Sequence, residues 1–194
     1  MIARLSKNVS SLFIEKGIIA EEDRGVYVYS FEVLFSTLLS FVTVLALTLL
    51  SGTLIYTVQY LIGFIPLRRI AGGFHAKNYF RCFVIFVTVH FAFLVILSLM
   101  PVNYMAITIA FCMAVSLLSV HCFAPSEDKN KPISKSDKSK LRKRSYIAII
   151  VYIIAISVLA MIVPDRRMAF SVMMGVFTVA VSLLANFVKN RGAS

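Results

Sequence analysis

Long runs of apolar residues, interrupted by short polar stretches, make up most of the chain from residue 31 onward. A bilayer core of about 30 Å requires about 20 apolar residues in one helix. Turn signals at Ser51-Gly52, Pro101, Pro125 and Pro164 divide the runs into pieces of about this length. The pattern predicts an all-α integral membrane protein with about six transmembrane helices. We expect these spans at 31–51, 53–67, 82–100, 103–124, 146–163 and 168–188.

The second expected span is short, because its 15 residues rise only about 22 Å in a helix. It either continues past Arg68 or enters the membrane as a re-entrant segment. The distribution of cations favours a full crossing. With six crossings, both termini, the 68–81 loop and the 126–145 basic linker share one side, and only Arg166 and Arg167 of the 20 Lys and Arg lie on the other. The positive-inside rule makes the basic side, and both termini, cytoplasmic.

Residues 1–25 precede the first span and carry apolar side chains at three- and four-residue spacing, which is typical of an amphipathic helix. The apolar positions are Ile2, Leu5, Val9, Leu12 and Phe13. Cations such as Lys7 could meet anionic headgroups, which favours an interfacial helix. The alternative is a solvated helix packed on the rest of the chain. In either case we expect a single membrane domain over 1–194.

The composition supports this interpretation. Hydrophobic residues make up 59% of the chain, and the mean hydropathy is +0.87. The net charge of +11 is also typical of nucleic-acid-binding proteins. Here, however, the cations flank the apolar runs, so we expect contact with an anionic inner membrane leaflet and no nucleic-acid partner.

The segment around His75 and Cys82 carries the groups that a thiol nucleophile needs. A thiol attacks as its thiolate, which a histidine, a helix N-terminus or nearby cations stabilise. Asn78 is a candidate N-cap for the third span, and Cys82 then falls in its first turn, where the helix dipole favours negative charge. Seven residues of straight helix climb about 10 Å, so the chain must fold back for the two side chains to meet. Gly72-Gly73 supplies the backbone freedom.

Glu32 is the only acid inside an expected span, which makes it a candidate functional residue. Its carboxylate could orient the imidazole of His75, or it could pair structurally with Arg68 or Arg69. Rival orienting groups for the imidazole are Gln59 and Asn78.

The remaining histidines and cysteines are expected to have packing roles. His121 and Cys122 are adjacent on a helix and point about 100° apart, which suits a catalytic pair poorly. His90 and Cys112 lie in the middle of expected spans. The chain has no metal-ligand spacing such as Cys-x2-Cys or His-Glu-x2-His, so we expect neither a metal nor a cofactor.

Residues 68–82 combine an arginine, a glycine pair, His75-Ala76 and a cysteine in an order that resembles AgrB, the accessory gene regulator B family of membrane peptidases. Ala124-Pro125, followed by the lysine-rich stretch 129–144, resembles the same family. The likeness in hydropathy and motif order extends over essentially the whole chain.

The resemblance implies a membrane cysteine endopeptidase that cleaves a quorum-sensing pro-peptide and cyclises it to a thiolactone. Carried onto this sequence, Cys82 is the nucleophile and His75 the general base, while Arg68 and Gly73 occupy further essential positions. The implied partner is an AgrD-like precursor peptide. By its own composition the basic linker is most simply a solvated determinant of topology, and it could also bind an anionic lipid or the acidic tail of a precursor. The implied location is the cytoplasmic membrane, with the active site on the cytoplasmic side. Six short spans offer a small substrate chamber, which is compatible with a homodimer.

Two other functions stay open at the level of sequence. The first is a small transporter or exporter of peptides, although transporters tend to have broken helices and charges at the membrane midplane. The second is a non-catalytic membrane adaptor, which needs no histidine and cysteine among glycines and cations.

Overall fold

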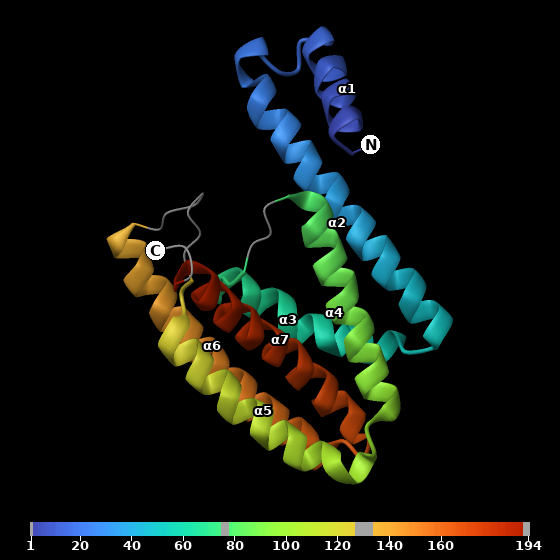
Figure 1. The fold of residues 1–194 in the computed structure, drawn as a ribbon, viewed down its shortest axis with the longest axis vertical. Helices are drawn as coiled ribbons and strands as arrows, with labels where there is room; N and C mark the ends of the chain where they lie inside the picture. Colours follow the sequence, from blue (N-terminus) through green and yellow to red (C-terminus); the bar gives the residue numbers. More distant parts are fainter. Residues whose placement is uncertain (1, 75–77, 127–133, 192–194) are drawn as a thin grey trace. The chain divides into compact units, whose positions relative to one another are not determined.

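The computed structural model describes residues 2–74, 78–126 and 134–191. These ranges contain seven α-helices, one short 3-10 helix and no strand (Figure 1). The α-helices are α1 Ile2–Glu15, α2 Arg24–Ser51, α3 Leu54–Ala71, α4 Tyr79–Leu99, α5 Val102–Phe123, α6 Lys135–Ile162 and α7 Arg166–Arg191, and the 3-10 helix is η1 Glu21–Asp23. The predicted all-α fold is thus confirmed.

Five helices within the described ranges are long and apolar enough to cross a membrane: α2, α4, α5, α6 and α7. They fit a multi-pass membrane protein, and they expose many large apolar side chains, such as Leu50 at 88% and Ile107 at 69%, which suit contact with lipid. The remaining expected span, the second at 53–67, corresponds to α3. Its polar residues lower its hydropathy, but the helix does continue past Arg68 and reaches Ala71.

The largest difference from the sequence-based boundaries concerns the basic linker 126–145. Its second half is helical, because α6 begins at Lys135, eleven residues before the expected start of that span at 146. Ser134 caps this start, and its Oγ accepts a hydrogen bond from the backbone N–H of Asp137 at 3.2 Å. Hydropathy cannot detect this extension, because the first turns of α6 are polar while their backbone is helical. Similarly, α2 begins at Arg24, ahead of Phe31.

The chain divides into two compact units. Unit 1 comprises residues 1–50 and 76–91, which form α1, α2 and the first half of α4. Aromatic contacts join these helices: the Phe13 and Phe31 ring centroids lie 5.6 Å apart, and those of Phe41 and Phe86 lie 6.3 Å apart. The buried positions of α2 are mostly small hydroxyl residues, Ser36, Ser40 and Thr48, beside Val44.

Unit 2 comprises residues 51–75 and 92–194, and α7 is its central helix. Figure 1 shows α5, α6 and α7 side by side, and α3 packs on α7 as well. Small residues allow the close approach of α3 to α7. A side chain at Gly63 would meet the carbonyl oxygen of Val172, and one at Gly175 would meet that of Tyr60. Inside a membrane, such close packing replaces the hydrophobic effect as the main source of helix association.

Hydrogen bonds between helices complete the core of unit 2. The Tyr60 hydroxyl donates to Thr178 Oγ1 at 3.1 Å, which joins α3 to α7. The Tyr152 hydroxyl donates to the carbonyl of Ile62 at 2.6 Å, which joins α6 to α3. Double-mutant cycles in a membrane protein give about 0.6 kcal/mol for an average hydrogen bond of this kind. Close packing and these bonds together hold α3 and α7 rigidly against each other, and this helix pair supports the chain that follows Ala71.

Candidate functional site

Arg68, in the last turn of α3, holds the chain that leaves the helix. Its Nη1 donates to the carbonyl of Gly72 at 2.7 Å and to Ser182 Oγ of α7 at 2.9 Å. Its Nη2 donates to the carbonyl of Phe74. A guanidinium can serve three acceptors at once because its donors form a rigid planar fork, which a lysine ammonium lacks. The side chain of Arg68 therefore fixes the path of residues 72–74.

The two glycines of this segment are required by its geometry. Gly72 has φ +77° and ends α3, with its N–H bonded to the carbonyl of Arg68 at 3.1 Å. Gly73 has φ +132°, which side chains rarely adopt, and an added Cβ would collide with the Arg68 guanidinium and Ser182 Oγ. Gly73 thus leaves the space that the Arg68 side chain occupies.

Helix α7 provides the surface on which this segment rests. The N–H of Phe74 donates to the carbonyl of Ser182 at 3.0 Å, and Lys189 Nζ lies 5.0 Å from the centre of the Phe74 ring. Asn186 of α7 donates to Ser126 Oγ at 2.5 Å, and the Ser126 N–H in turn donates to the carbonyl of Ala71 at 2.9 Å. Residues 71–74 are thus tied to α7 up to the position before His75. His75 itself lies outside the described residues.

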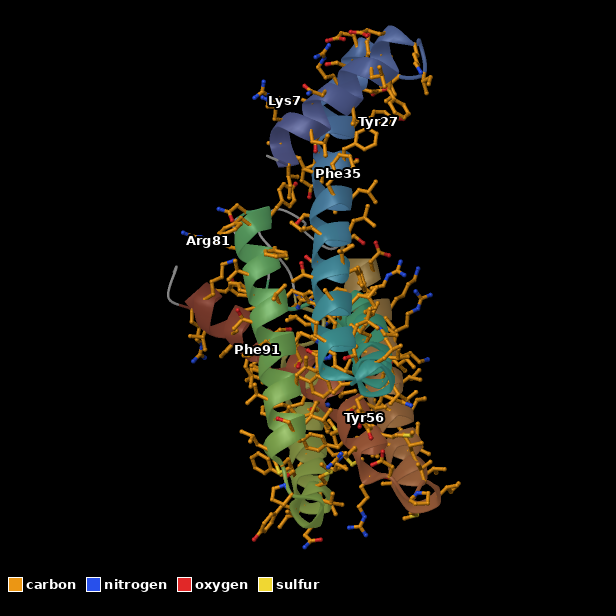
Figure 2. The ribbon with its side chains drawn as sticks, turned by 90° about the vertical axis from the view of Figure 1, so that its right-hand side faces the viewer. Lys7, Tyr27, Phe35, Tyr56, Arg81 and Phe91 are labelled. Atoms are coloured by element: carbon orange, nitrogen blue, oxygen red, sulfur yellow. The ribbon has the colours of Figure 1, made fainter. Side chains whose placement is uncertain are left out.

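Cys82 lies exposed in the first turn of α4. Asn78 Oδ1 accepts a hydrogen bond from the N–H of Arg81 at 2.9 Å, which confirms the predicted N-cap. The N–H of Cys82 donates to the carbonyl of Asn78 at 3.1 Å, the first bond of the helix. The exposed cation Arg81 projects from the same turn (Figure 2). Cys82 thus lies at the positive end of the α4 helix dipole, beside an exposed cation.

Glu32 is half-buried on α2, and its charge acts on Tyr79, the residue that begins α4. The Tyr79 ring lies against Tyr29 of α2, with 6.1 Å between the ring centroids. Glu32 and Cys82 therefore belong to the same unit, at the end of α2 that meets the start of α4. Its role toward His75 stays a prediction. Gln59 lies nine residues before Arg68 on α3, which separates it from that helix end by about 13 Å.

Sequence analysis did not single out Ser182, Asn186, Ser126 or Lys189, which hold residues 71–74. A signal for two of them was present, because Ser182 and Asn186 are four residues apart and so lie on one face of an otherwise apolar helix. Polar side chains at helical spacing within a membrane span usually face a protein interior.

The environments of His90 and Cys112 agree with packing, whereas His121 and Cys122 are exposed at the end of α5. His90 is fully buried, with Nε2 lying 3.4 Å from Thr48 Oγ1, and Cys112 is buried as well. His121 contacts the Tyr146 ring edge-on, with 5.7 Å between centroids. Within the described ranges, no cluster of three or more His, Cys, Asp or Glu side chains could hold a metal ion.

The fold and these residues define a class of multi-pass helical membrane protein. Its members carry an exposed thiol at the start of a helix, and a pair of glycines that an arginine side chain holds in place just before a histidine. The chain belongs to the accessory gene regulator B (AgrB) family, whose family model matches residues 2–184. Membership of this family implies a role in quorum sensing and an association with an AgrD-like precursor peptide.

Similar proteins carry related names. A putative AgrB-like protein of Listeria innocua is 25% identical over 174 residues, covering 88% of this chain and 82% of that protein. Protein FsrB of Enterococcus faecalis is 33% identical over 130 residues, covering 65% of this chain and 52% of FsrB. A putative AgrB-like protein of Clostridium perfringens is 26% identical over 167 residues, covering 84% and 78% of the two chains. No solved structure matches the chain.

Proposed function

We propose that this protein is a membrane-embedded cysteine endopeptidase that cleaves a quorum-sensing pro-peptide and cyclises the signal segment to a thiolactone. Cys82 is the nucleophile and His75 is the general base. The observation that carries the proposal is the exposed thiol in the capped first turn of α4, seven residues after a histidine. This is an environment in which a cysteine becomes reactive.

The three cysteines of the chain support the choice of Cys82. Cys112 is buried in the middle of α5, where a peptide substrate cannot reach it. Cys122 is exposed but lies in the last turn of α5, where the helix dipole opposes negative charge. Cys82 alone of the three combines exposure with a helix N-terminus.

Arg68 and Gly73 act as positioning residues in this proposal. They fix residues 72–74 on α7 and thereby limit where the backbone of the next residue, His75, can begin. Preorganisation of this kind matters because a displacement of about 1 Å can cost a hundred-fold in rate. Glu32, at the α2 end that meets the start of α4, is the proposed partner that orients the imidazole.

The reaction balances without a cofactor. His75 removes the proton from the Cys82 thiol, and the thiolate attacks the scissile carbonyl. The peptide C–N bond breaks, the imidazolium returns the proton to the leaving amine, and a thioester joins the signal segment to Cys82. A cysteine thiol within the bound signal segment then displaces Cys82, forming the cyclic thiolactone and restoring the enzyme thiol. Exclusion of water protects the thioester from hydrolysis.

The proposed topology is one membrane domain with six crossings, α3 being the second, and with α1 at the interface. Both termini, the 68–81 segment and the basic stretch 126–145 then lie on the cytoplasmic side of the cell membrane, facing the anionic leaflet. The precursor binds on this side, where the proposed site lies, and a homodimer would enlarge the substrate chamber.

A cleavage assay tests the proposal. Detergent-solubilised protein is mixed with a candidate precursor that has an amphipathic start, a central cysteine and an acidic tail, and the products are weighed. We expect a smaller, iodoacetamide-sensitive product from the wild-type protein and none from Cys82→Ser or His75→Ala. Cys122→Ser is the matched control, because it removes another exposed thiol, and it should retain processing. A transporter or adaptor would yield no product from any variant, and normal processing by Cys82→Ser would refute the proposal.

A further inference from the structure

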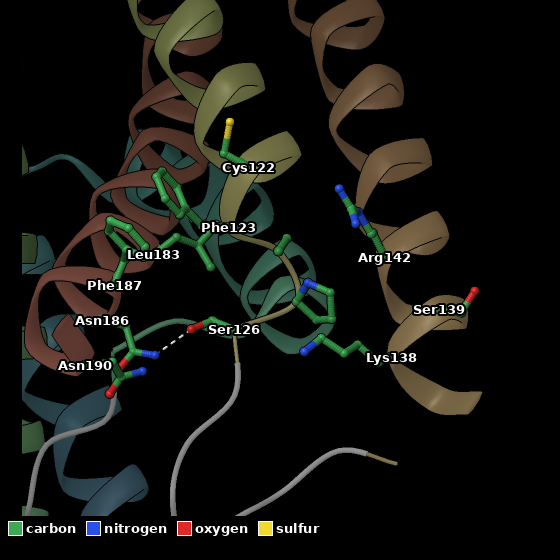
Figure 3. Close-up of a pocket in the computed structure, with 12 residues that line it drawn as sticks. Cys122, Phe123, Ser126, Lys138, Ser139, Arg142, Leu183, Asn186, Phe187 and Asn190 are labelled. Carbon is green, nitrogen blue, oxygen red and sulfur yellow. Dashed lines mark hydrogen bonds between the residues drawn. The ribbon is translucent and has the colours of Figure 1, made fainter. Parts of the chain in front are cut away.

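A cavity of about 610 Å³ opens where α5, α6 and α7 of unit 2 end on their basic side (Figure 3). The end of α5 and the residues after it, 122–126, form one wall. The first turns of α6 and the last turns of α7 form the others. The twelve lining residues are Cys122, Phe123, Ala124, Pro125, Ser126, Lys138, Ser139, Arg142, Leu183, Asn186, Phe187 and Asn190.

The lining separates into a cationic side and an apolar side. Lys138 and Arg142 extend from α6 toward the end of α5 (Figure 3), and no acid is among the lining residues that the structure describes. The opposite side carries Phe123, Leu183 and Phe187. Asn186 and Asn190 add amide groups on α7. This chemistry suits a ligand that is anionic at one end and hydrocarbon at the other.

The cavity also lies at the depth where all three helices change from apolar to polar. Helix α5 is apolar up to Phe123, and the apolar part of α6 begins at Tyr146, just after its basic turns. Helix α7 becomes basic at Lys189. In a multi-pass membrane protein this change marks the headgroup level of the bilayer. Basic pockets between helices at that level are typical sites for anionic lipid headgroups.

We infer that this cavity binds one anionic phospholipid, with its phosphodiester between Lys138 and Arg142 and its acyl chains along Phe123 and Phe187. The cationic wall and the apolar wall together favour a lipid over a free anion, because a free anion has no hydrocarbon part that could contact the apolar wall. They also favour a lipid over an acidic peptide, whose backbone needs polar partners on both sides. The inference uses neither His75 nor Cys82 and does not rest on the peptidase reaction.

Cys122 lines the cavity and is exposed, so its alkylation reports on occupancy. Purified full-length protein is reconstituted into vesicles of phosphatidylcholine alone or with phosphatidylglycerol added, and peptide mass spectrometry follows iodoacetamide labelling of Cys122 and Cys82. We expect phosphatidylglycerol to slow labelling of Cys122 relative to Cys82. The concentration for half-protection should rise about five-fold in Arg142→Gln, because one cation near a membrane surface contributes that factor in affinity.

Lys140→Gln is the matched control, because Lys140 has the same charge and lies on the same turns of α6 but does not line the cavity. It should leave half-protection unchanged. Equal shifts in the two variants would show diffuse attraction to the basic helix and overturn the inference. Equal protection by phosphatidylcholine would overturn it too. Inorganic phosphate that protects Cys122 as well as the lipid, or a glutamate-rich peptide that protects it better, would assign the cavity to a different ligand.

Discussion

The chain before His75 and the turn that carries Cys82 are held in opposite ways. Arg68, Ser182 and α7 fix residues 72–74 through side-chain and backbone bonds, and Gly73 is buried among them. Cys82 is exposed, and the start of its helix is held by the Asn78 cap. In the proposed peptidase, this difference would place the general base directly after a rigidly held segment and leave the nucleophile open to a large substrate.

The first prediction, with the largest expected effect, concerns the rigidly held residues 72–74. Arg68→Lys keeps the charge but loses the planar fork that serves Gly72, Phe74 and Ser182. We expect precursor processing to fall about a hundred-fold, since small displacements of a catalytic group have this effect. Arg69→Lys changes an exposed neighbour and should process normally. Equal rates for both variants, measured at saturating precursor, would show that the Arg68 fork does not position the site.

The second prediction concerns the support beneath that segment. Gly175→Ala places a methyl group against the backbone of Tyr60 and Phe64, and overpacking of this kind costs about 2 kcal/mol. Gly25→Ala, on α2, meets nothing within 4 Å and removes a flexible residue from a helix. Unfolding in a denaturing-detergent titration should show Gly175→Ala as less stable than the wild type and Gly25→Ala as equal or more stable. The reverse order would mean that α3 and α7 do not pack this closely.

The third prediction, with the smallest expected effect, concerns the exposed first turn of α4 that carries Cys82. Asn78→Ala removes the cap of α4, which costs about 1 kcal/mol at the helix start. A frayed first turn weakens the dipole at Cys82, so iodoacetamide labelling of Cys82 near neutral pH should slow about two- to five-fold. Asn78→Asp retains an oxygen acceptor and should keep the wild-type rate. Faster labelling in Asn78→Ala would indicate that access, and not thiolate stabilisation, governs the reactivity of Cys82.

Sequence patterns predicted much of the fold, because Pro101, Pro164 and the Ser51-Gly52 turn separate helices that hydropathy alone can detect. The all-α class and the Asn78 cap follow from such local rules. The start of α6 at Lys135 was missed because hydropathy does not register a polar helical turn, although Ser134 and Asp137 form a recognisable cap.

The support of the candidate site could not be predicted in the same way. The bonds from Arg68 to Ser182 and from Asn186 to Ser126 join residues more than 50 positions apart, so they depend on how α3 and α5 pack on α7. The sequence marks Gly73 as a flexible position, but the reason for a glycine there, the space filled by the Arg68 guanidinium, appears only in the folded chain.

The most direct test of the proposed peptidase is the intact mass of the enzyme during turnover. A precursor whose internal cysteine is replaced by alanine cannot complete cyclisation, so the acyl-enzyme should accumulate. We predict an adduct with the mass of the precursor up to the cleaved bond, located on Cys82, removed by hydroxylamine and absent in Cys82→Ser. Cleavage of the wild-type precursor without any such adduct, or an adduct on Cys122, would contradict the account.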